Sequence, residues 1–340
     1  MDDNLLYPLK FIPIFKEKIW GGTRIKTSLG LNFGRVSPCG EAWMLSGIDQ
    51  EESVVANGFL EGNTLVDLVE VYMGDLVGEK NYQKFGLQFP LLFKWIDAEQ
   101  NLSVQVHPND ALAKERHQCL GKSEMWFMAE AEKGAELICG FQPKINQMQY
   151  LKALEKGDLE KVLLRQKVEK GGAFYIPAGT VHALGKGLLL AEIQQCSDIT
   201  YRIYDWNRKD AEGKSRELHT ELALQALRFE GDRLTKELAD TIVDAGRILY
   251  GRGKNRTNEI LNTPYFQVNY LCLDSGIEKD FSELDSFVVY LCLKGKAVLK
   301  ADSKVVEISQ GELVLIPAIC NVLAFYPDTL GCELLETYIL

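Results

Sequence analysis

Apolar and polar residues form many short runs along the chain, in the pattern of β-strands. Runs such as LLFKWIDA (91–98), LLLAEIQQ (188–195) and SFVVYLCL (286–293) are separated by Gly, Pro, Asn and Asp. Many short strands divided by turn residues are typical of an antiparallel sandwich or barrel. We therefore predict a mainly β fold.

Helical spacing of apolar residues interrupts the strand pattern in three places, at about 64–84, 109–120 and 145–165. Thr64 and Asn109 are suitable N-cap residues for the first two stretches. We predict helical insertions there and a small helical region in a chain otherwise built of strands.

The pattern G-x-x-x-x-I-P-A occurs twice, from Gly171 and from Gly311. Two copies about 140 positions apart indicate two related β-domains. We predict a catalytic domain over 1–230, a polar, helical linker over 231–255 and a second domain over 256–340. Aligning the copies places Val322 where the first has His182, so the second domain is expected to be non-catalytic.

Composition and charge narrow the possible functions. The 340 residues carry a net charge of -10 with no block of like charges, which argues against a nucleic-acid or basic membrane-surface role. No apolar run is long enough for a membrane span, and the first residues lack a basic, then apolar leader. Eight cysteines without a C-x-x-C pair fit reduced thiols in a cytoplasmic protein.

The chemistry of interest begins in NLSVQVHPND (101–110), where Gln105 and His107 share one strand face. Glu124 begins a later strand, and His182 follows a Pro-Ala-Gly turn. Two imidazole nitrogens, one carboxylate and one amide oxygen suit a catalytic zinc with an open position. Taken singly, each side chain also fits an ordinary role on a strand or in a turn.

The remaining histidines, His117 and His219, lie in amphipathic stretches, and we expect structural roles for them.

Six segments together resemble type I phosphomannose isomerases of the short bacterial form. They are QVHPND, GKSEMWF, IPAGTVHALGKG, LLAEIQQCSDITYRIYDW, and KEKIWGG with GEAWMLSG. The resemblance is dense over about 10–220 and implies two cupin-type jelly-roll barrels. It also implies a zinc-dependent interconversion of mannose 6-phosphate and fructose 6-phosphate by a monomer or weak homodimer. It assigns one zinc per chain to Gln105, His107, Glu124 and His182.

The resemblance further implies catalytic roles for Lys94, Lys122, Glu192 and Arg202. Each has an alternative: Lys94 could extend to a barrel rim, for example, and Arg202 could pair with Asp198 or Asp205. Burying Lys94 or Glu192 without a partner would be costly, which favours a functional site for both.

An acidic protein needs local cations to hold a phosphate, and we expect them from Lys94, Lys122 and Arg202, with Lys186 and Arg208 as further candidates.

The implied chemistry passes through an enediolate, whose charge a zinc ion can stabilise. Glu192, the lysines and a zinc-bound water are all possible bases, and Glu192 is our preferred choice. Two other functions use the same fold: a cupin dioxygenase with the same ligand types, and a sugar-binding cupin without catalysis.

Overall fold

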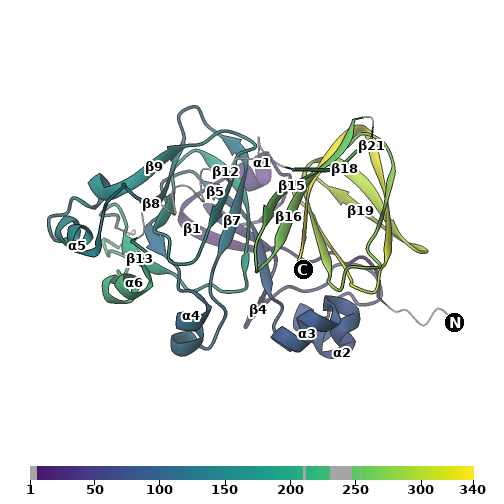
Figure 1. Cartoon of the computed structure of the whole chain (residues 1–340). Coiled ribbons are helices and arrows are strands. Elements are labelled where there is room, and N and C mark those ends of the chain that lie inside the picture. The colour runs from purple at the N-terminus through teal and green to yellow at the C-terminus, as the bar shows by residue number, and fades with distance from the viewer. Residues whose placement is uncertain (1–5, 210–211, 230–246, 253) are drawn as a thin grey trace.

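The structure is a computed structural model that describes residues 6–209, 212–229, 247–252 and 254–340. Two curved β-sheet bodies lie side by side, the first in purple to teal and the second in green to yellow (Figure 1). Within the described residues, no helix combines the length and apolar character needed to cross a membrane. All eight cysteines are free thiols, in keeping with the expectation from their spacing.

The first body consists of two antiparallel sheets. One has six strands in the order β1-β2-β5-β12-β7-β10. These are Ile14–Gly22, Cys39–Leu45, Leu91–Ala98, Leu188–Gln195, Glu124–Ala131 and Ala173–Ile176. The other has five strands in the order β13-β6-β11-β8-β9. These are Tyr201–Tyr204, Val104–Val106, His182–Leu184, Glu136–Phe141 and Leu163–Lys167. The short pair β3 (Gly47–Ile48) and β4 (Glu51–Glu52) lies outside both sheets.

The second body is an eight-stranded antiparallel sheet. Its main order is β14-β15-β16-β21-β18-β19, with β17 on β21 and β20 on β18. The strands β14 to β21 are Arg247–Arg252, Asn255–Asn262, Gln267–Leu273, Ile277–Asp280, Val288–Ala301, Lys304–Ser309, Leu313–Ile316 and Val322–Tyr338.

The predicted helical linker over 231–255 is wrong where it can be compared. Its described part contains β14, which pairs with β15 from Arg252 opposite Asn255 to Arg247 opposite Glu259. Ile248 and Tyr250 favour strands, and this pairing satisfies backbone groups at the edge of β15. The rest of the predicted linker, 231–246 and 253, lies outside the described residues.

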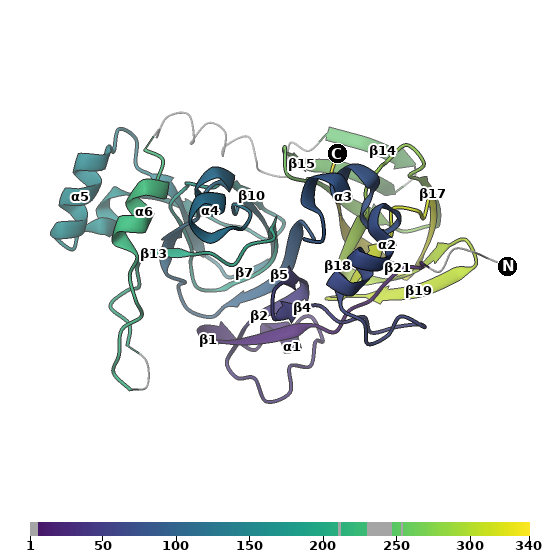
Figure 2. The ribbon, with the colours of Figure 1, turned by 90° about the horizontal axis from the view of Figure 1, so that it is seen from below.

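Helices occur at all three predicted insertions. They are α2 (Leu65–Val77) and α3 (Glu79–Phe85), then α4 (Asp110–His117), then α5 (Gln147–Glu155) with the 3-10 turn Leu159–Val162. Two more helices, α1 (Arg24–Thr27) and α6 (Thr220–Ala226), lie elsewhere in the chain. Strand β9 begins at Leu163, inside the third predicted insertion. Figure 2 shows α5 and α6 on the side of the first body remote from the second.

Gly78 divides the first helical stretch and brings it against the second body. Its φ of 91° suits glycine, and a Cβ there would lie 2.4 Å from the carbonyl oxygen of Asp285. The Asp285 carboxylate accepts hydrogen bonds from the backbone N–H groups of Glu79 (2.6 Å) and Lys80 (3.0 Å). A carboxylate at the start of a helix is favourable because the first backbone N–H groups have no hydrogen-bond partner within the helix.

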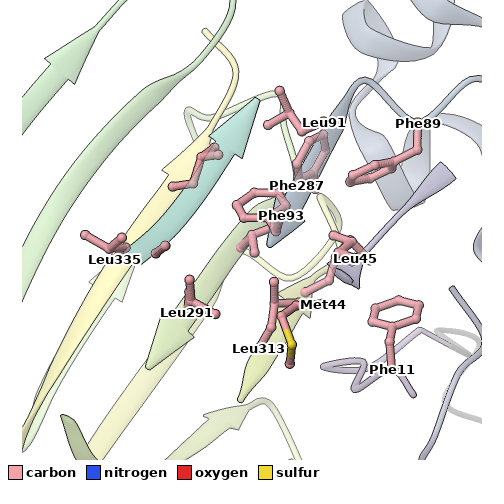
Figure 3. Packing of buried hydrophobic residues seen from close by; sticks show 14 of the residues in the cluster. Phe11, Met44, Leu45, Phe89, Leu91, Phe93, Phe287, Leu291, Leu313 and Leu335 are labelled. Atoms are coloured by element: carbon pink, nitrogen blue, oxygen red, sulfur yellow. The ribbon is translucent and has the colours of Figure 1, made fainter. Parts of the chain in front are cut away.

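The two bodies also share one apolar core (Figure 3). It joins Leu45 and Phe93 of the first body to Leu291 and Leu335 of the second. The indole N–H of Trp95 crosses the boundary and donates to the Gly311 carbonyl oxygen at 2.8 Å. The bodies are therefore packed together through a continuous apolar core.

The repeated G-x-x-x-x-I-P-A pattern has the same backbone form in both bodies. Gly171 and Gly311 have φ values of 82° and 86°. Their N–H groups donate at 2.8 Å to Met128 and Cys292, on the strands that pair with β10 and β20.

Val322 begins β21 as His182 begins β11, at the same position after the repeated pattern, but the two side chains face different ways. Val322 is 39% exposed, whereas Leu323 is fully buried in the core of the second body. Because neighbouring strand residues face opposite sides, Leu323 takes the inward position that His182 has in the first body.

Candidate metal centre and pocket

Three strand ends bring the predicted ligands together. Gln105 lies on β6 directly opposite His182, the first residue of β11. His107 follows β6, where Pro108 ends the pairing, and Glu124 is the first residue of β7. The strand alternation expected from the sequence thus places Gln105 and His107 on the side that Glu124 and His182 approach.

His107, Glu124 and His182 form a compact cluster whose ligand atoms all lie within 4.8 Å of one another. Glu124 Oε2 lies 3.4 Å from His107 Nε2, and Glu124 Oε1 lies 3.3 Å from His182 Nε2. The three side chains are at most 1% exposed.

Backbone carbonyls fix the tautomer of both imidazoles. His107 Nδ1 is 2.9 Å from the Ile199 oxygen, and His182 Nδ1 is 2.9 Å from the Thr180 oxygen. A carbonyl oxygen only accepts, so each Nδ1 carries the proton and each Nε2 presents a lone pair. Burial lowers the pKa of both histidines, which keeps them neutral as metal ligands must be.

The cluster is incomplete as a purely protein hydrogen-bond network. Among the described residues, His107 Nε2 and both Glu124 oxygens are buried and have no hydrogen-bond partner. Leaving one such atom unsatisfied costs about 1–3 kcal/mol, and more for a charged group. A divalent cation would bind all three of these lone-pair atoms at once, so this set of donor atoms fits a metal.

Gln105 lies beside this cluster, with its amide nitrogen 3.3 Å from His182 Nε2. The amide oxygen is the atom that could bind a metal, and a half-turn of the amide group exchanges the two positions.

A pocket of about 450 Å³ opens beside the cluster, with Gln105 in its wall. Lys94 and Glu192, each about 6% exposed in the side chain, form an ion pair of 3.0 Å there. Lys94 Nζ also donates to Gln194 Oε1 at 2.7 Å, and Trp126 Nε1 donates to Glu192 Oε1 at 2.9 Å. The register of β12 explains this, because Glu192 lies opposite Lys94 on one side and Trp126 on the other.

The pKa values of the two buried lysines of the pocket are shifted in opposite directions. Burial lowers the pKa of Lys94, but Glu192 and Glu41 outweigh it, and the pKa is raised. Burial, then the repulsion of Lys94, lowers the pKa of Lys122, whose Nζ lies 4.0 Å from Glu124 Oε2. Lys94 is thus held as an ammonium, and Lys122 gives up its proton more easily.

Arg202, on β13, lines the same pocket. Its Nη1 donates to the Glu217 carbonyl oxygen at 2.8 Å, and its Nε is buried with no hydrogen-bond partner in the described part of the chain. The alternative pairing with Asp205 is absent from the described hydrogen bonds, because Arg208 and Arg216 hold that carboxylate. Arg202 therefore keeps donor capacity for a ligand.

Other cations at the pocket differ from those expected. Lys186 and Arg208 are not among its lining residues, whereas Lys16, Lys18 and Arg216 are. The alternation of Lys16 and Lys18 places them on one strand face, a signal that the sequence contained. The sequence around Arg216 gives no sign of a place in the pocket, because only the fold brings this residue there.

The two remaining histidines contact the β13 region. His117 Nε2 lies 2.7 Å from the hydroxyl of Tyr201, and His219 Nδ1 accepts from the backbone N–H of Arg202 at 3.1 Å. Both contacts join these histidines to other parts of the first body.

Comparisons with known proteins point to one family. The family model "Phosphomannose isomerase type I, catalytic domain" matches residues 8–143. A putative mannose-6-phosphate isomerase of Bacillus subtilis is 33% identical over 315 residues, which are 92% of this chain and 93% of the relative. Mannose-6-phosphate isomerase ManA of the same species is 44% identical over 227 residues, covering 65% of this chain and 68% of the relative.

A solved structure is similar over almost the whole chain. The crystal structure of the mannose 6-phosphate isomerase from Bacillus subtilis has a TM-score of 0.85 and 31% identity, and covers 98% of this chain and 99% of its own. This agreement and the sheet order confirm the prediction of a mainly β fold with two cupin-type barrels and helical insertions. The first body is called the first barrel below, and the second body the C-terminal barrel.

Proposed function

Since the chain belongs to the type I phosphomannose isomerase family, we propose that it interconverts mannose 6-phosphate and fructose 6-phosphate with one zinc ion. One observation carries the proposal: a buried His107, Glu124 and His182 cluster with unpartnered ligand atoms lies next to a pocket rich in cations.

The donor set supports zinc as the metal. Two neutral imidazoles and a carboxylate are the ligands of many catalytic zinc sites, and Gln105 Oε1 is a candidate fourth ligand. When bound, zinc supplies Lewis-acid stabilisation to the oxygens of the reacting sugar.

The charges of the pocket support a sugar phosphate as substrate. Its described lining has six basic and four acidic side chains, although the protein as a whole is acidic. Arg202 has an unpartnered, buried Nε, so we assign it a contact to phosphate or sugar oxygen. Lys94 remains an ammonium in this scheme, and it holds the Glu192 carboxylate in place.

We assign the proton transfer between C1 and C2 to Glu192. The carboxylate faces the pocket, and the Trp126 indole and the Lys94 ammonium fix its orientation. Accepting the proton from one carbon and returning it to the next needs one base on one face of the C1–C2 bond. Lys122 is the second candidate, because its lowered pKa makes a neutral amine more accessible.

A coupled assay with mannose 6-phosphate tests the function, before and after chelation and with zinc restored. We expect activity that disappears with the metal and returns with zinc. Glu192→Gln should keep bound zinc but stop solvent deuterium from entering the product, while Glu307→Gln, on the exposed β19 surface, leaves both unchanged. A Glu192→Gln enzyme that exchanges deuterium at the normal rate would show that another group is the base.

A further inference from the structure

A second pocket, of about 470 Å³, lies at the mouth of the C-terminal barrel. It shares no described lining residue with the pocket beside the metal cluster. Strand β17 and the end of β21 form much of its wall. Its base contains Glu336, which is 1% exposed.

Glu336 is held by several donors in an otherwise apolar barrel. Its Oε1 accepts from Asn269 Nδ2 at 2.8 Å, and its Oε2 accepts from the Tyr290 hydroxyl at 2.6 Å. Lys279 forms an ion pair with the same Oε2. Asn269 and Tyr290 are at most 1% exposed, and Lys279 is 20% exposed in the side chain.

The carboxylate and its aromatic donor have corresponding strand positions in the two barrels. Glu192 on β12 lies opposite Trp126 on β7, and Glu336 on β21 lies opposite Tyr290 on β18. In each barrel the aromatic side chain donates to the carboxylate. The repeated G-x-x-x-x-I-P-A turn gives β7 and β18 the same place in the two barrels.

The C-terminal barrel therefore keeps a lysine–carboxylate pair like that of the first pocket, but its described part lacks a cluster of metal ligands. A lysine meets the carboxylate in both barrels, through Lys94 in the first and Lys279 in the second. Leu323 fills the inward position that His182 has in the first barrel, and the described residues contain no second cluster of metal-ligand type.

Fold stability alone does not account for the buried pair of Glu336 and Lys279. Replacing a buried ion pair by well-packed apolar side chains is often neutral or stabilising, because desolvation offsets the attraction. A partly open pocket with a few convergent polar groups on an apolar wall is instead typical of a small-molecule site. Phe281 and Leu284 supply apolar wall here.

The charges around this pocket exclude a phosphorylated ligand. Glu278, Asp280 and Glu283 are exposed at its edge, and Lys279 is the sole basic residue in its described lining. Because Lys279 is already paired with Glu336, a phosphate would meet repulsion without a free cation. Asn269, Tyr338 and the ion pair of Glu336 with Lys279 all line the pocket, and a neutral ring with several hydroxyl groups can both donate to and accept from such groups.

We propose that the C-terminal barrel binds an unphosphorylated hexose in this pocket. The binding site is separate from the metal cluster, and the proposal stands whether or not the first pocket catalyses the isomerisation.

Hydrogen–deuterium exchange of the full chain tests the site, with D-mannose, mannose 6-phosphate and D-glucosamine as probes. D-mannose should slow exchange in peptides covering 277–284 and 334–340. Mannose 6-phosphate should leave those peptides unchanged. Unchanged exchange of both peptides at saturating D-mannose overturns the proposal, and so does a response to D-glucosamine alone, which would indicate a site for cations.

Two variants separate binding from folding. Glu336→Gln removes a charged acceptor and should weaken D-mannose binding about 10- to 100-fold, as expected for a charge-assisted hydrogen bond. Leu284→Trp, at a half-buried position of the wall, should fill the pocket and abolish the protection without changing the buried polar groups. The matched substitution Glu192→Gln in the first barrel should leave protection of 277–284 unchanged. Full protection in Leu284→Trp would overturn the proposal even if Glu336→Gln does not fold.

Discussion

Glu124→Gln should have opposite effects on the metal-free and the metal-bound protein. In the absence of metal, the Glu124 carboxylate is fully buried and both oxygens lack a hydrogen-bond partner. Gln has the same shape without the charge, and its amide N–H can donate to His182 Nε2, now 3.3 Å from Glu124 Oε1. The substitution should therefore stabilise the metal-free protein.

The size of this gain follows from the groups involved. Removing a buried, unsatisfied acceptor and adding one hydrogen bond should raise the unfolding free energy by about 1–3 kcal/mol. That corresponds to a rise in Tm of a few degrees. If the native protein binds zinc as proposed, zinc at about 100 times its Kd should add about 2.7 kcal/mol, and Glu124→Gln should lose most of this addition.

Thermal unfolding with chelator and with added zinc measures both effects. Asp97→Asn is the control, because Asp97 is also buried but is fully partnered by the backbone N–H and Nε of Arg24, at 2.6 and 2.8 Å. It should lower Tm in both conditions and keep the zinc-dependent rise. A Glu124→Gln protein that is less stable than the native chain without metal, yet keeps its zinc response, would refute the reasoning.

Three further predictions concern other parts of the first barrel. His182→Ala should lose zinc and activity but retain the fold, as zinc analysis and circular dichroism would show; a fully active variant without altered metal content would contradict the ligand assignment. Lys94→Met should lower the unfolding free energy in urea by about 3–5 kcal/mol by leaving Glu192 unpaired, and adding Glu192→Gln should recover part of it. Burial raises the pKa of Asp205, but hydrogen bonds from Arg216 and Arg208 outweigh it, so the pKa is lowered. Its stabilisation is therefore present above about pH 4 and is lost as the pH falls through the lowered pKa, and Asp205→Asn should flatten the unfolding free energy over that acid range.

The sequence predicted that His107, Glu124 and His182 converge, because the signal for this convergence is local. Gln105 and His107 are two residues apart on one strand, and Glu124 and His182 lie at strand starts marked by turn residues. The strand alternation therefore fixes which way each side chain points.

Other features depend on contacts between distant strands and had no local signal. The pairing of Lys94 with Glu192 follows from the register of β5 with β12, which neither segment encodes alone. Arg216 reaches the pocket only through the path of the chain between β13 and α6. The sequence predicts helix over β14 because the strand alternation there is short and adjoins a polar stretch. Pairing with β15, a contact that the local sequence does not encode, makes this segment a strand.

An anomalous-diffraction map at the zinc absorption edge, from crystals of the active enzyme, tests the central claim most directly. We predict one strong peak per chain, bonded to Nε2 of His107, Nε2 of His182 and the carboxylate of Glu124. A peak elsewhere, or full isomerase activity in crystals without a peak at this cluster, would contradict the account.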